Sequence, residues 1–195
     1  MKRAGDLFVS GLLLVLLAVP MLAVAGLLWW RQGRPILFRQ ERMGRHGTPF
    51  HILKFRTMRA PEPGEALVTS GDSDARVTPI GAALRRRRLD EFPQLWNVLR
   101  GDMSLVGPRP EVPRYVNLND PDWKTALTVR PGITGPDALA FRNEGEELAE
   151  AENPENHYQQ VILPAKLALQ VQYAREHSVT GDVRLLFRTL GALRG

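Results

Sequence analysis

The sequence predicts a mainly α-helical fold with one small β-hairpin, an α+β class, in which a membrane segment over residues 1–33 precedes a domain over residues 34–195. Three observations support this fold class. Residues 7–30 carry no charged side chain. Two short apolar runs, near residues 36 and 50, flank a glycine-containing turn. Beyond residue 80, apolar side chains recur at helical spacing.

The uncharged run over residues 7–30 is the first predicted element. As one helix, its 24 residues would extend about 36 Å, enough to cross a hydrocarbon core of about 30 Å. Ala23-Val24-Ala25 resembles the cleavage site of a signal peptide, but the apolar run continues to Trp30. A signal peptide is therefore the weakest of three interpretations, beside a spanning helix and a re-entrant helix.

Two features favour the re-entrant helix, which enters and leaves the membrane by one face. Pro20 removes a backbone donor in the middle of the run and bends a helix. Basic residues flank both ends, and positive charge tends to stay on the cytoplasmic side. They are Lys2 and Arg3 before the run, and Arg31, Arg34, Arg39, Arg42 and Arg45 after it. Proline kinks also occur in spanning helices, so the residues alone leave both interpretations open.

Residues 35–58 predict the β-hairpin. Its strands are expected at Ile36-Leu37-Phe38 and at Phe50-His51-Ile52-Leu53, joined by the turn Met43-Gly44-Arg45-His46-Gly47. The polar, proline- and glycine-rich residues 60–75 predict a loop.

Two helices are expected next. The first covers residues 81–89 and contains the run Arg85-Arg86-Arg87-Arg88. Asp90 is predicted to cap the second, over residues 91–99, with Pro93 in its first turn and Gly101 at its end. The apolar stripe of the second helix consists of Phe92, Leu95, Trp96 and Leu99.

The rest of the chain alternates rigid loops and helices. Three prolines and a glycine exclude a regular helix over residues 104–114, and residues 130–136 predict a second rigid loop. An acidic stretch over residues 144–155 precedes two helices, at about 157–176 and 182–193. Pro164 is expected to kink the first of these two helices.

The composition of the chain excludes several kinds of chemistry. The chain has no cysteine, which excludes disulfides, cysteine-ligated metals and a thiol nucleophile. Residues 31–130 hold 18 basic and 11 acidic side chains, a net charge of +7, whereas residues 131–195 have a net charge of −3. The central part therefore carries the anion-attracting surface.

Asp90-Glu91 is the first candidate for chemistry. Most acidic pairs at helix starts are structural caps, but four arginines precede this one. A carboxylate near a helix N-terminus and several cations is expected to be ionised at neutral pH. Such a carboxylate suits nucleophilic attack on phosphorus, or the binding of Mg²⁺ that bridges it to a diphosphate.

Two basic motifs are further candidates. In Gly107-Pro108-Arg109-Pro110, prolines on both sides hold Arg109 in a preset pose, although a rigid surface turn would have the same pattern. Lys54-Phe55-Arg56-Thr57-Met58 is a basic strand end, a feature that is often without function. The four arginines could equally meet anionic lipid headgroups.

Three of these motifs together resemble the bacterial sugar transferases, the monotopic phosphoglycosyl transferases. The matching segments are Lys54 to Met58, the 22-residue block from Leu89 to Pro110, and Arg130 to Gly135. The central block is the most specific of the three. The chain length resembles the small single-domain branch, which lacks an additional amino-terminal transmembrane bundle.

The resemblance implies a phosphoglycosyl transferase that moves a sugar 1-phosphate from a UDP-sugar to a polyprenol phosphate, expected to be undecaprenyl phosphate. UMP is the other product, and the reaction is the first membrane step of glycoconjugate synthesis. The resemblance also implies Mg²⁺, a re-entrant helix in one leaflet with its bend at Pro20, and interfacial amphipathic helices. The catalytic domain would lie on the cytoplasmic face of the inner membrane, and a homodimer is compatible with this arrangement.

The resemblance also assigns site residues. Asp90 is the implied nucleophile, forms a phosphosugar intermediate and approaches the metal, and Glu91 completes the catalytic dyad. The implied substrate-binding residues are Lys54, Arg56, Arg85, Pro108, Arg109, Pro110 and Arg142.

The chain departs from the family pattern after Gly135. Many members continue Gly-Trp-Ala-Gln-Val-Asn-Gly-Arg, whereas residues 135–142 read Gly-Pro-Asp-Ala-Leu-Ala-Phe-Arg, so that Arg142 alone keeps its place after the glycine. Gln170 stands where many members carry an aspartate, three residues before Tyr173. Val19 precedes Pro20, where serine is frequent. The changes after Gly135 concern the sugar-side contacts rather than the phosphoryl chemistry.

Two other classes of function are alternatives. A non-enzymatic membrane module would use Arg85–Arg88 to bind lipid or a partner, would release no UMP and would tolerate Glu91→Gln. A nucleic-acid-binding protein is disfavoured, because the sequence contains no helix-turn-helix, zinc-finger or RNA-binding motif.

Overall fold

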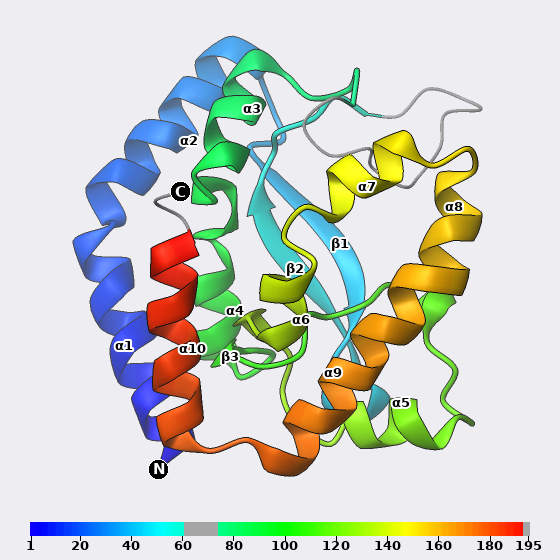
Figure 1. Ribbon diagram of the computed structural model, residues 1–195. Helices are drawn as coiled ribbons and strands as arrows, with labels where there is room; N and C mark the ends of the chain where they lie inside the picture. Colours follow the sequence, from blue (N-terminus) through cyan, green and yellow to red (C-terminus); the bar gives the residue numbers. More distant parts are fainter. Residues whose placement is uncertain (61–73, 193–195) are drawn as a thin grey trace.

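The computed structural model describes residues 1–60 and 74–192 and is mostly helical, with a two-stranded antiparallel sheet (Figure 1). The predicted fold class is confirmed in these two respects. The loop predicted over residues 60–75 lies mainly outside the described residues.

The uncharged amino-terminal run forms two helices, α1 (Lys2–Leu16) and α2 (Ala18–Gln32). In the described part of the chain, no single helix is long and apolar enough to cross a membrane. The two helices together meet this criterion by length and composition, and the angle between them is 61°. The break at Leu17 lies three residues before Pro20. Pro20 has no N–H to donate to the carbonyl of Leu16, which explains why the helix is interrupted there.

The predicted hairpin is confirmed. Strands β1 (Leu37–Met43) and β2 (Pro49–Phe55) pair antiparallel, with Leu37 opposite Phe55 and Met43 opposite Pro49. The turn between them contains Gly47 with a φ of 72°, a left-handed conformation that glycine adopts without strain.

Helix α3 (Pro79–Arg86) starts two residues before the predicted Gly81, because the Thr78 hydroxyl caps it and accepts from the Gly81 N–H at 3.0 Å. It also ends earlier than predicted. Arg88 has a φ of 54°, and this left-handed residue separates α3 from the turn that follows.

The prediction that Asp90 caps a helix over residues 91–99 is wrong. Residues Leu89–Glu91 form one 3₁₀ turn, and α4 (Gln94–Arg100) begins only after Pro93. Gly101 ends α4 in the left-handed conformation, as expected. The consequence is that Asp90 and Glu91 belong to a tight turn with buried side chains rather than to a helix terminus.

The predicted apolar stripe of α4 is also partly wrong. Leu95 is buried, but Trp96 is 53% exposed. Polar side chains take part of the inward face instead, because Gln94 and Asn97 are both 1% exposed. Asn97 accepts a hydrogen bond from the N–H of Leu53, so this inward face meets the edge of β2.

A second, parallel sheet joins the two segments predicted as rigid loops. Strands β3 (Ser104–Val106) and β4 (Gly132–Thr134) have three residues each, which is too short for a recognisable alternation. The backbones approach so closely that a Cβ on Gly132 would lie 2.1 Å from the nitrogen of Gly107. Only glycine fits at this crossing.

Most of the described chain beyond β4 is helical. The helix predicted over residues 157–176 is divided, since a π-helical turn at Tyr158–Ile162 precedes α9 and Pro164 lies in the first turn of α9. The acidic stretch forms α7. The bounds are α5 Pro121–Ala126, α6 Pro136–Ala140, α7 Glu144–Glu150, α8 Pro154–His157, α9 Leu163–Glu176 and α10 Val179–Ala192.

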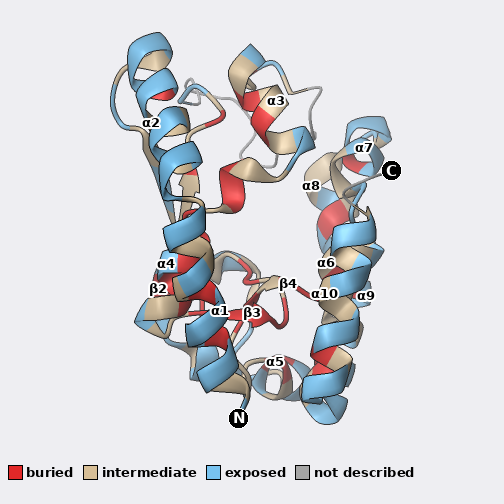
Figure 2. Ribbon diagram, turned by 90° about the vertical axis from the view of Figure 1, so that its left-hand side faces the viewer, coloured by how far each residue is buried: buried red, intermediate tan, exposed pale blue. Residues whose placement is uncertain are grey.

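The helix pair shares a core with the rest of the chain. Leu28 of α2 is 1% exposed and packs with Phe55 and Leu84. The outward surface of the pair is largely exposed in Figure 2. Its exposed large apolar side chains include Leu7, Phe8, Leu12, Val15, Leu16, Val19, Leu22, Leu27, Trp29 and Trp30.

The start of α1 is held by polar contacts. The ammonium of Lys2 donates to the carbonyl of Val106 at 2.9 Å and pairs with Asp182 of α10 at 2.5 Å. The carboxylate of Asp6 accepts from the Ser104 hydroxyl at 2.8 Å. The beginning of α1 is therefore held against β3.

The end of α2 is held in the same way. Arg56, which follows β2, donates to the carbonyls of Gln32, Gly33 and Arg34. Both ends of the bent pair thus contact the same body of the protein.

Candidate active site

Glu91 is the centre of a buried cluster of charges. Its Oε1 accepts from the ammonium of Lys54 at 2.8 Å and from the Nη2 of Arg109 at 2.9 Å, and the guanidinium of Arg88 lies 3.9 Å away. Lys54 comes from the end of β2, Arg109 from the loop after β3, and Glu91 from the 3₁₀ turn. Three segments far apart in the sequence therefore converge on one carboxylate oxygen.

The cations decide the charge of Glu91. Burial alone would raise its pKa, but the charges of Lys54, Arg109 and Arg88 outweigh burial and hold the pKa well below its usual range. The pKa of Arg109 is raised, chiefly by Glu91. Glu91 is thus an ionised acceptor that holds two basic side chains in place.

Asp90 lies beside this cluster but is not bound by it. Its side chain is 7% exposed, and its Oδ1 has no hydrogen-bond partner among the described residues. Burial raises the pKa of Asp90, while the charges of Lys54, Arg85 and Arg88 act in the opposite direction. The expected cations are present, but burial outweighs them and no helix terminus assists. The predicted reason for ionisation therefore needs correction.

The donor set fits Mg²⁺ at Asp90. Mg²⁺ is usually held by one or two carboxylates together with waters and substrate phosphates. The buried Oδ1 of Asp90 is an unused oxygen acceptor of this kind. Within the described ranges, no group of three or more histidine, cysteine or acidic side chains could hold a metal by itself. A magnesium ion here would therefore depend on the phosphates of a substrate for further ligands.

The loop that carries Arg109 is built from rigid parts. It leaves β3 through Gly107, and Pro108 and Pro110 flank the arginine. Two buried side chains contact its backbone, Asp137 of α6 and Gln170 of α9. Sequence reasoning noted both residues only as departures from a family pattern and assigned neither a role. Their position against Arg109 depends on contacts between distant segments.

A second buried charge cluster adjoins this loop and was not predicted. The ammonium of Lys166 lies 3.2 Å from Glu111 and 2.9 Å from Glu144. Lys166 and Glu111 are 3% and 4% exposed. Arg42 donates to the carbonyl of Pro110 at 3.0 Å. One feature of the sequence could have indicated this cluster, namely a lysine within the apolar stretch Leu163-Pro164-Ala165-Lys166-Leu167. When such a stretch packs inward, its lysine needs a buried counter-ion.

The predicted site residues therefore do not all lie in the charged cluster. Lys54, Asp90, Glu91 and Arg109 gather in one cluster, and the charge of Arg85 acts on Asp90. Arg56 instead caps the end of α2, and Arg142 is exposed and donates to the Asn143 side chain. Substrate contacts of Arg56 and Arg142 stay predictions.

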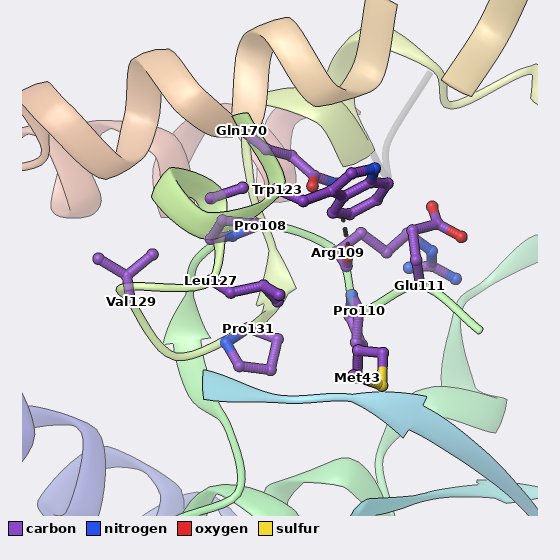
Figure 3. A pocket seen from close by; sticks show the side chains of 11 residues that line it. Met43, Pro108, Arg109, Pro110, Glu111, Trp123, Leu127, Val129, Pro131 and Gln170 are labelled. Carbon is purple, nitrogen blue, oxygen red and sulfur yellow. Dashed lines mark hydrogen bonds between the residues drawn. The ribbon is translucent and has the colours of Figure 1, made fainter. Parts of the chain in front are cut away.

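A small pocket is lined in part by the Arg109 loop (Figure 3). Pro108, Pro110, Trp123 and Leu127 are among its lining residues, and Asp90 and Glu91 are not. Its volume of about 10 Å³ accommodates one water molecule. The chemistry therefore belongs to the charged cluster and not to this pocket.

Comparison with known proteins gives the family of the chain. The family model described as bacterial sugar transferase matches residues 1–194. It includes the helix pair, the charged cluster and the carboxyl-terminal helices.

Three relatives illustrate the range. The UDP-glucose:undecaprenyl-phosphate glucose-1-phosphate transferase of Caulobacter vibrioides is 36% identical over 98% of this chain and 69% of its own length. The Escherichia coli protein of the same name is 33% identical over 97% of this chain, but only 39% of its own length is covered. The UDP-N-acetylgalactosamine-undecaprenyl-phosphate N-acetylgalactosaminephosphotransferase of Aeromonas hydrophila is 39% identical over 69% of this chain and 32% of its own length.

Proposed function

Since this chain belongs to the bacterial sugar transferase family, we propose that it transfers a sugar 1-phosphate from a UDP-sugar to a polyprenol phosphate in glycan synthesis. The relatives are named as enzymes that act on undecaprenyl phosphate, which contradicts the alternative of a non-enzymatic lipid-binding module. The observation that carries the proposal is the contrast between Glu91, whose Oε1 binds Lys54 and Arg109, and the adjacent buried Asp90, whose Oδ1 has no hydrogen-bond partner among the described residues.

The proposed reaction has two steps on Asp90. An oxygen of the Asp90 carboxylate attacks the phosphorus that bears the sugar, the bond from that phosphorus to the bridging oxygen breaks, and UMP leaves with the bridging oxygen. An oxygen of the polyprenol phosphate then attacks the same phosphorus. The aspartyl oxygen leaves, the carboxylate is regenerated, and a polyprenyl-diphosphate sugar forms.

The basic residues around Asp90 provide the electrostatic part of this mechanism. Lys54 and Arg109 are fixed by Glu91, so their positive charges are oriented before a substrate arrives. Arg85 and Arg88 lie close enough to Asp90 to affect its pKa. When bound at Asp90, Mg²⁺ would supply further positive charge toward the diphosphate.

We also propose that the helix pair is re-entrant and lies in the cytoplasmic leaflet of the inner membrane, with the remainder of the chain on the cytoplasmic face. Three observations support this: the 61° bend, the exposed apolar surface with Trp29 and Trp30 near its end, and the attachment of both ends to one body. An enzyme placed at the interface can meet a water-soluble donor and a lipid acceptor. A homodimer stays a prediction.

A nucleotide-release assay tests the proposed activity. The purified chain in detergent is given Mg²⁺, polyprenol phosphate and a panel of UDP-sugars that includes UDP-glucose and UDP-N-acetylgalactosamine. We expect UMP release with at least one donor, and no measurable release from Asp90→Asn. Asp122→Asn changes an exposed carboxylate of α5; it is the matched control and should keep wild-type turnover. Near-wild-type turnover of Asp90→Asn would contradict the proposed nucleophile.

A further inference from the structure

The backbone of Arg109 is held on both sides by two buried side chains. Its N–H donates to Oδ2 of Asp137 at 3.0 Å, and its carbonyl accepts from Nε2 of Gln170 at 3.2 Å. The same amide nitrogen of Gln170 donates to Oδ2 of Asp137 at 2.6 Å. The three groups form a closed triangle, and Figure 3 shows Gln170 reaching from α9 toward the Arg109 loop.

The position of Arg109 explains why side chains are needed there. The hydrogen bonds around the β3–β4 pair extend to the Gly132 N–H, which donates to the carbonyl of Pro108 at 2.8 Å. Proline has no N–H, so Arg109 carries the only backbone donor among Pro108, Arg109 and Pro110. A buried backbone donor without a partner is costly. Asp137 satisfies it without any strand pairing.

The same residue connects this triangle to the charged cluster. From its fixed backbone, the guanidinium of Arg109 reaches Oε1 of Glu91 at 2.9 Å. A shift of the loop by a fraction of an ångström would lengthen this ion pair. The contacts of Asp137 and Gln170 therefore determine where the positive charge of Arg109 lies relative to Asp90 and Glu91.

Stability alone does not account for Asp137. Its side chain is completely buried, and its Oδ1 has no hydrogen-bond partner within the described part of the chain. Burying a carboxylate with an unsatisfied oxygen is unfavourable, and apolar residues of similar volume at such sites are often more stable. A carboxylate in this place is better explained by what it positions.

We propose that Asp137 and Gln170 are positioning residues that set the location of the Arg109 guanidinium in the active site. They are also two places where the chain departs from the pattern it otherwise resembles, and in the structure these departures contact each other. Helix α9 thereby contributes to a site formed mainly by residues 54–109. The inference rests on the proposed function only in naming a nucleotide sugar as the ligand that Arg109 meets.

A chemical-labelling experiment tests the positioning without any assay of activity. Phenylglyoxal reacts with accessible guanidinium groups, and peptide mass spectrometry gives the rate at Arg109 relative to the exposed Arg142 in the same molecule. Gln170→Met removes both donated hydrogen bonds but keeps the length of the side chain. We expect the relative rate at Arg109 to rise at least threefold in this variant. Gln172→Met, an exposed glutamine on the same helix that contacts Glu176, is the matched control and should leave the rate unchanged.

Variants of Asp137 separate positioning from a general loss of structure. Asn at this position can still accept from Arg109 and Gln170, so Asp137→Asn should keep the wild-type rate within about twofold. Asp137→Leu should raise the rate as Gln170→Met does. An unchanged Arg109 rate in both Gln170→Met and Asp137→Leu would overturn the proposal. A rise at Arg109 matched by an equal rise at the half-buried Arg130, whose Nε donates to the carbonyl of Gly101, would also overturn it, because the effect would then be global.

Kinetics then test whether the two residues act through Arg109. In a double-mutant cycle on kcat/KM for the donor, Gln170→Met should lower the value about tenfold by itself and less than twofold further in an Arg109→Ala background. A tenfold loss in both backgrounds would show that Gln170 acts independently and would contradict the proposal. If the wild-type chain turns over no UDP-sugar, the proposed function fails, whereas the labelling result still decides the positioning.

Discussion

Asp90 and Glu91 are adjacent in the chain, but their carboxylates have opposite surroundings. Glu91 accepts from Lys54 and Arg109, whereas the Oδ1 of Asp90 has no partner in the described residues. The pKa of Glu91 is lowered by these cations against the effect of burial, and the pKa of Asp90 is raised by burial. One carboxylate therefore stabilises the fold as an anion, and the other does not.

Neutralising the two carboxylates should change stability in opposite directions. Glu91→Gln removes the counter-charge of two partly buried cations and should lower the free energy of unfolding by about 2–3 kcal/mol. Asp90→Asn removes a buried charge whose desolvation the nearby cations only partly offset, and it should cause no loss, with a gain of up to about 1 kcal/mol. Thermal unfolding in detergent with a chelator present provides the comparison, because bound metal would change the environment of Asp90. Equal destabilisation by both variants would contradict this assignment.

The sequence motifs predicted the charged residues of the site but not the residues that hold them in place. Lys54, Asp90, Glu91 and Arg109 lie in short, characteristic segments, so the chemistry was visible before their partners were known. Lys166 and Asp137 act through residues far away in the sequence, and no local pattern shows such a contact. The effect of burial on the pKa of Asp90 was not predicted for the same reason, since burial is set by the packing of the whole chain.

Among the elements, the contact between β2 and α4 determines where the 3₁₀ turn lies. Asn97 of α4 accepts from the N–H of Leu53 at 3.0 Å and donates to the carbonyl of His51 at 2.8 Å. These two bonds pair one amide side chain with the free edge of β2, as a neighbouring strand would. The turn with Asp90 and Glu91 precedes α4 by a few residues, so its place relative to Lys54 follows from this contact.

Replacing Asn97 should therefore be costly. Asn97 is 1% exposed, and Asn97→Ala removes both of its hydrogen bonds to the backbone of β2, so the free energy of unfolding should fall by about 1–3 kcal/mol. Denaturant or thermal unfolding measures the loss. Asn119→Ala, an exposed asparagine in the loop before α5, is the control and should change stability by less than about 0.5 kcal/mol. A loss below about 1 kcal/mol at Asn97 would show that the contact does not hold β2.

The sequence predicted the longer elements and missed the short ones. The hairpin, the bend near Pro20 and the end of α4 at Gly101 follow from local signals that the structure retains. The strands β3 and β4 have three residues each and exist because Gly107, Gly132 and Gly135 allow close backbone approach. The cap at Asp90 was predicted from a frequent pattern, but Pro93 and the left-handed Arg88 favour a separate turn instead.

For the whole molecule, all three tyrosines are predicted to resist ionisation. Burial, aided by a hydrogen bond to Glu155, raises the pKa of Tyr115 to about 12. Burial also raises the pKa of Tyr158 and Tyr173, with contributions from Glu111 and Asp182. Because the folded pKa values exceed the unfolded value of about 10, the protonated tyrosines contribute their full stabilisation of the folded state below pH 10. It is lost as the pH rises through the folded values.

An absorbance titration measures this effect. Immediately after a jump to pH 11, the folded chain should show only a minor part of the tyrosinate absorbance that the same chain shows in denaturant. A single midpoint near pH 10 for all three phenols, without prior unfolding, would contradict the buried network around Glu111 and Asp182.

A re-entrant helix pair has both of its ends on the same side of the membrane, which labelling can test. The chain has no cysteine, so single cysteines at the exposed positions Ala4, in the first turn of α1, and Arg39, in β1 beyond the helix pair, can be labelled without interference. A re-entrant pair places both on the cytoplasmic side, so an impermeant reagent should label neither in intact cells and both after permeabilisation. Labelling of only one of the two in intact cells would show a spanning arrangement.

A covalent phosphosugar on Asp90 has one direct test. The purified chain is incubated with Mg²⁺ and an active UDP-sugar in the absence of acceptor, and its intact mass is recorded. We expect a mass increase of one sugar phosphate that peptide mapping assigns to Asp90, that disappears on addition of polyprenol phosphate, and that is absent from Asp90→Asn. Full turnover without any adduct on the protein, or an adduct on another residue, would contradict it.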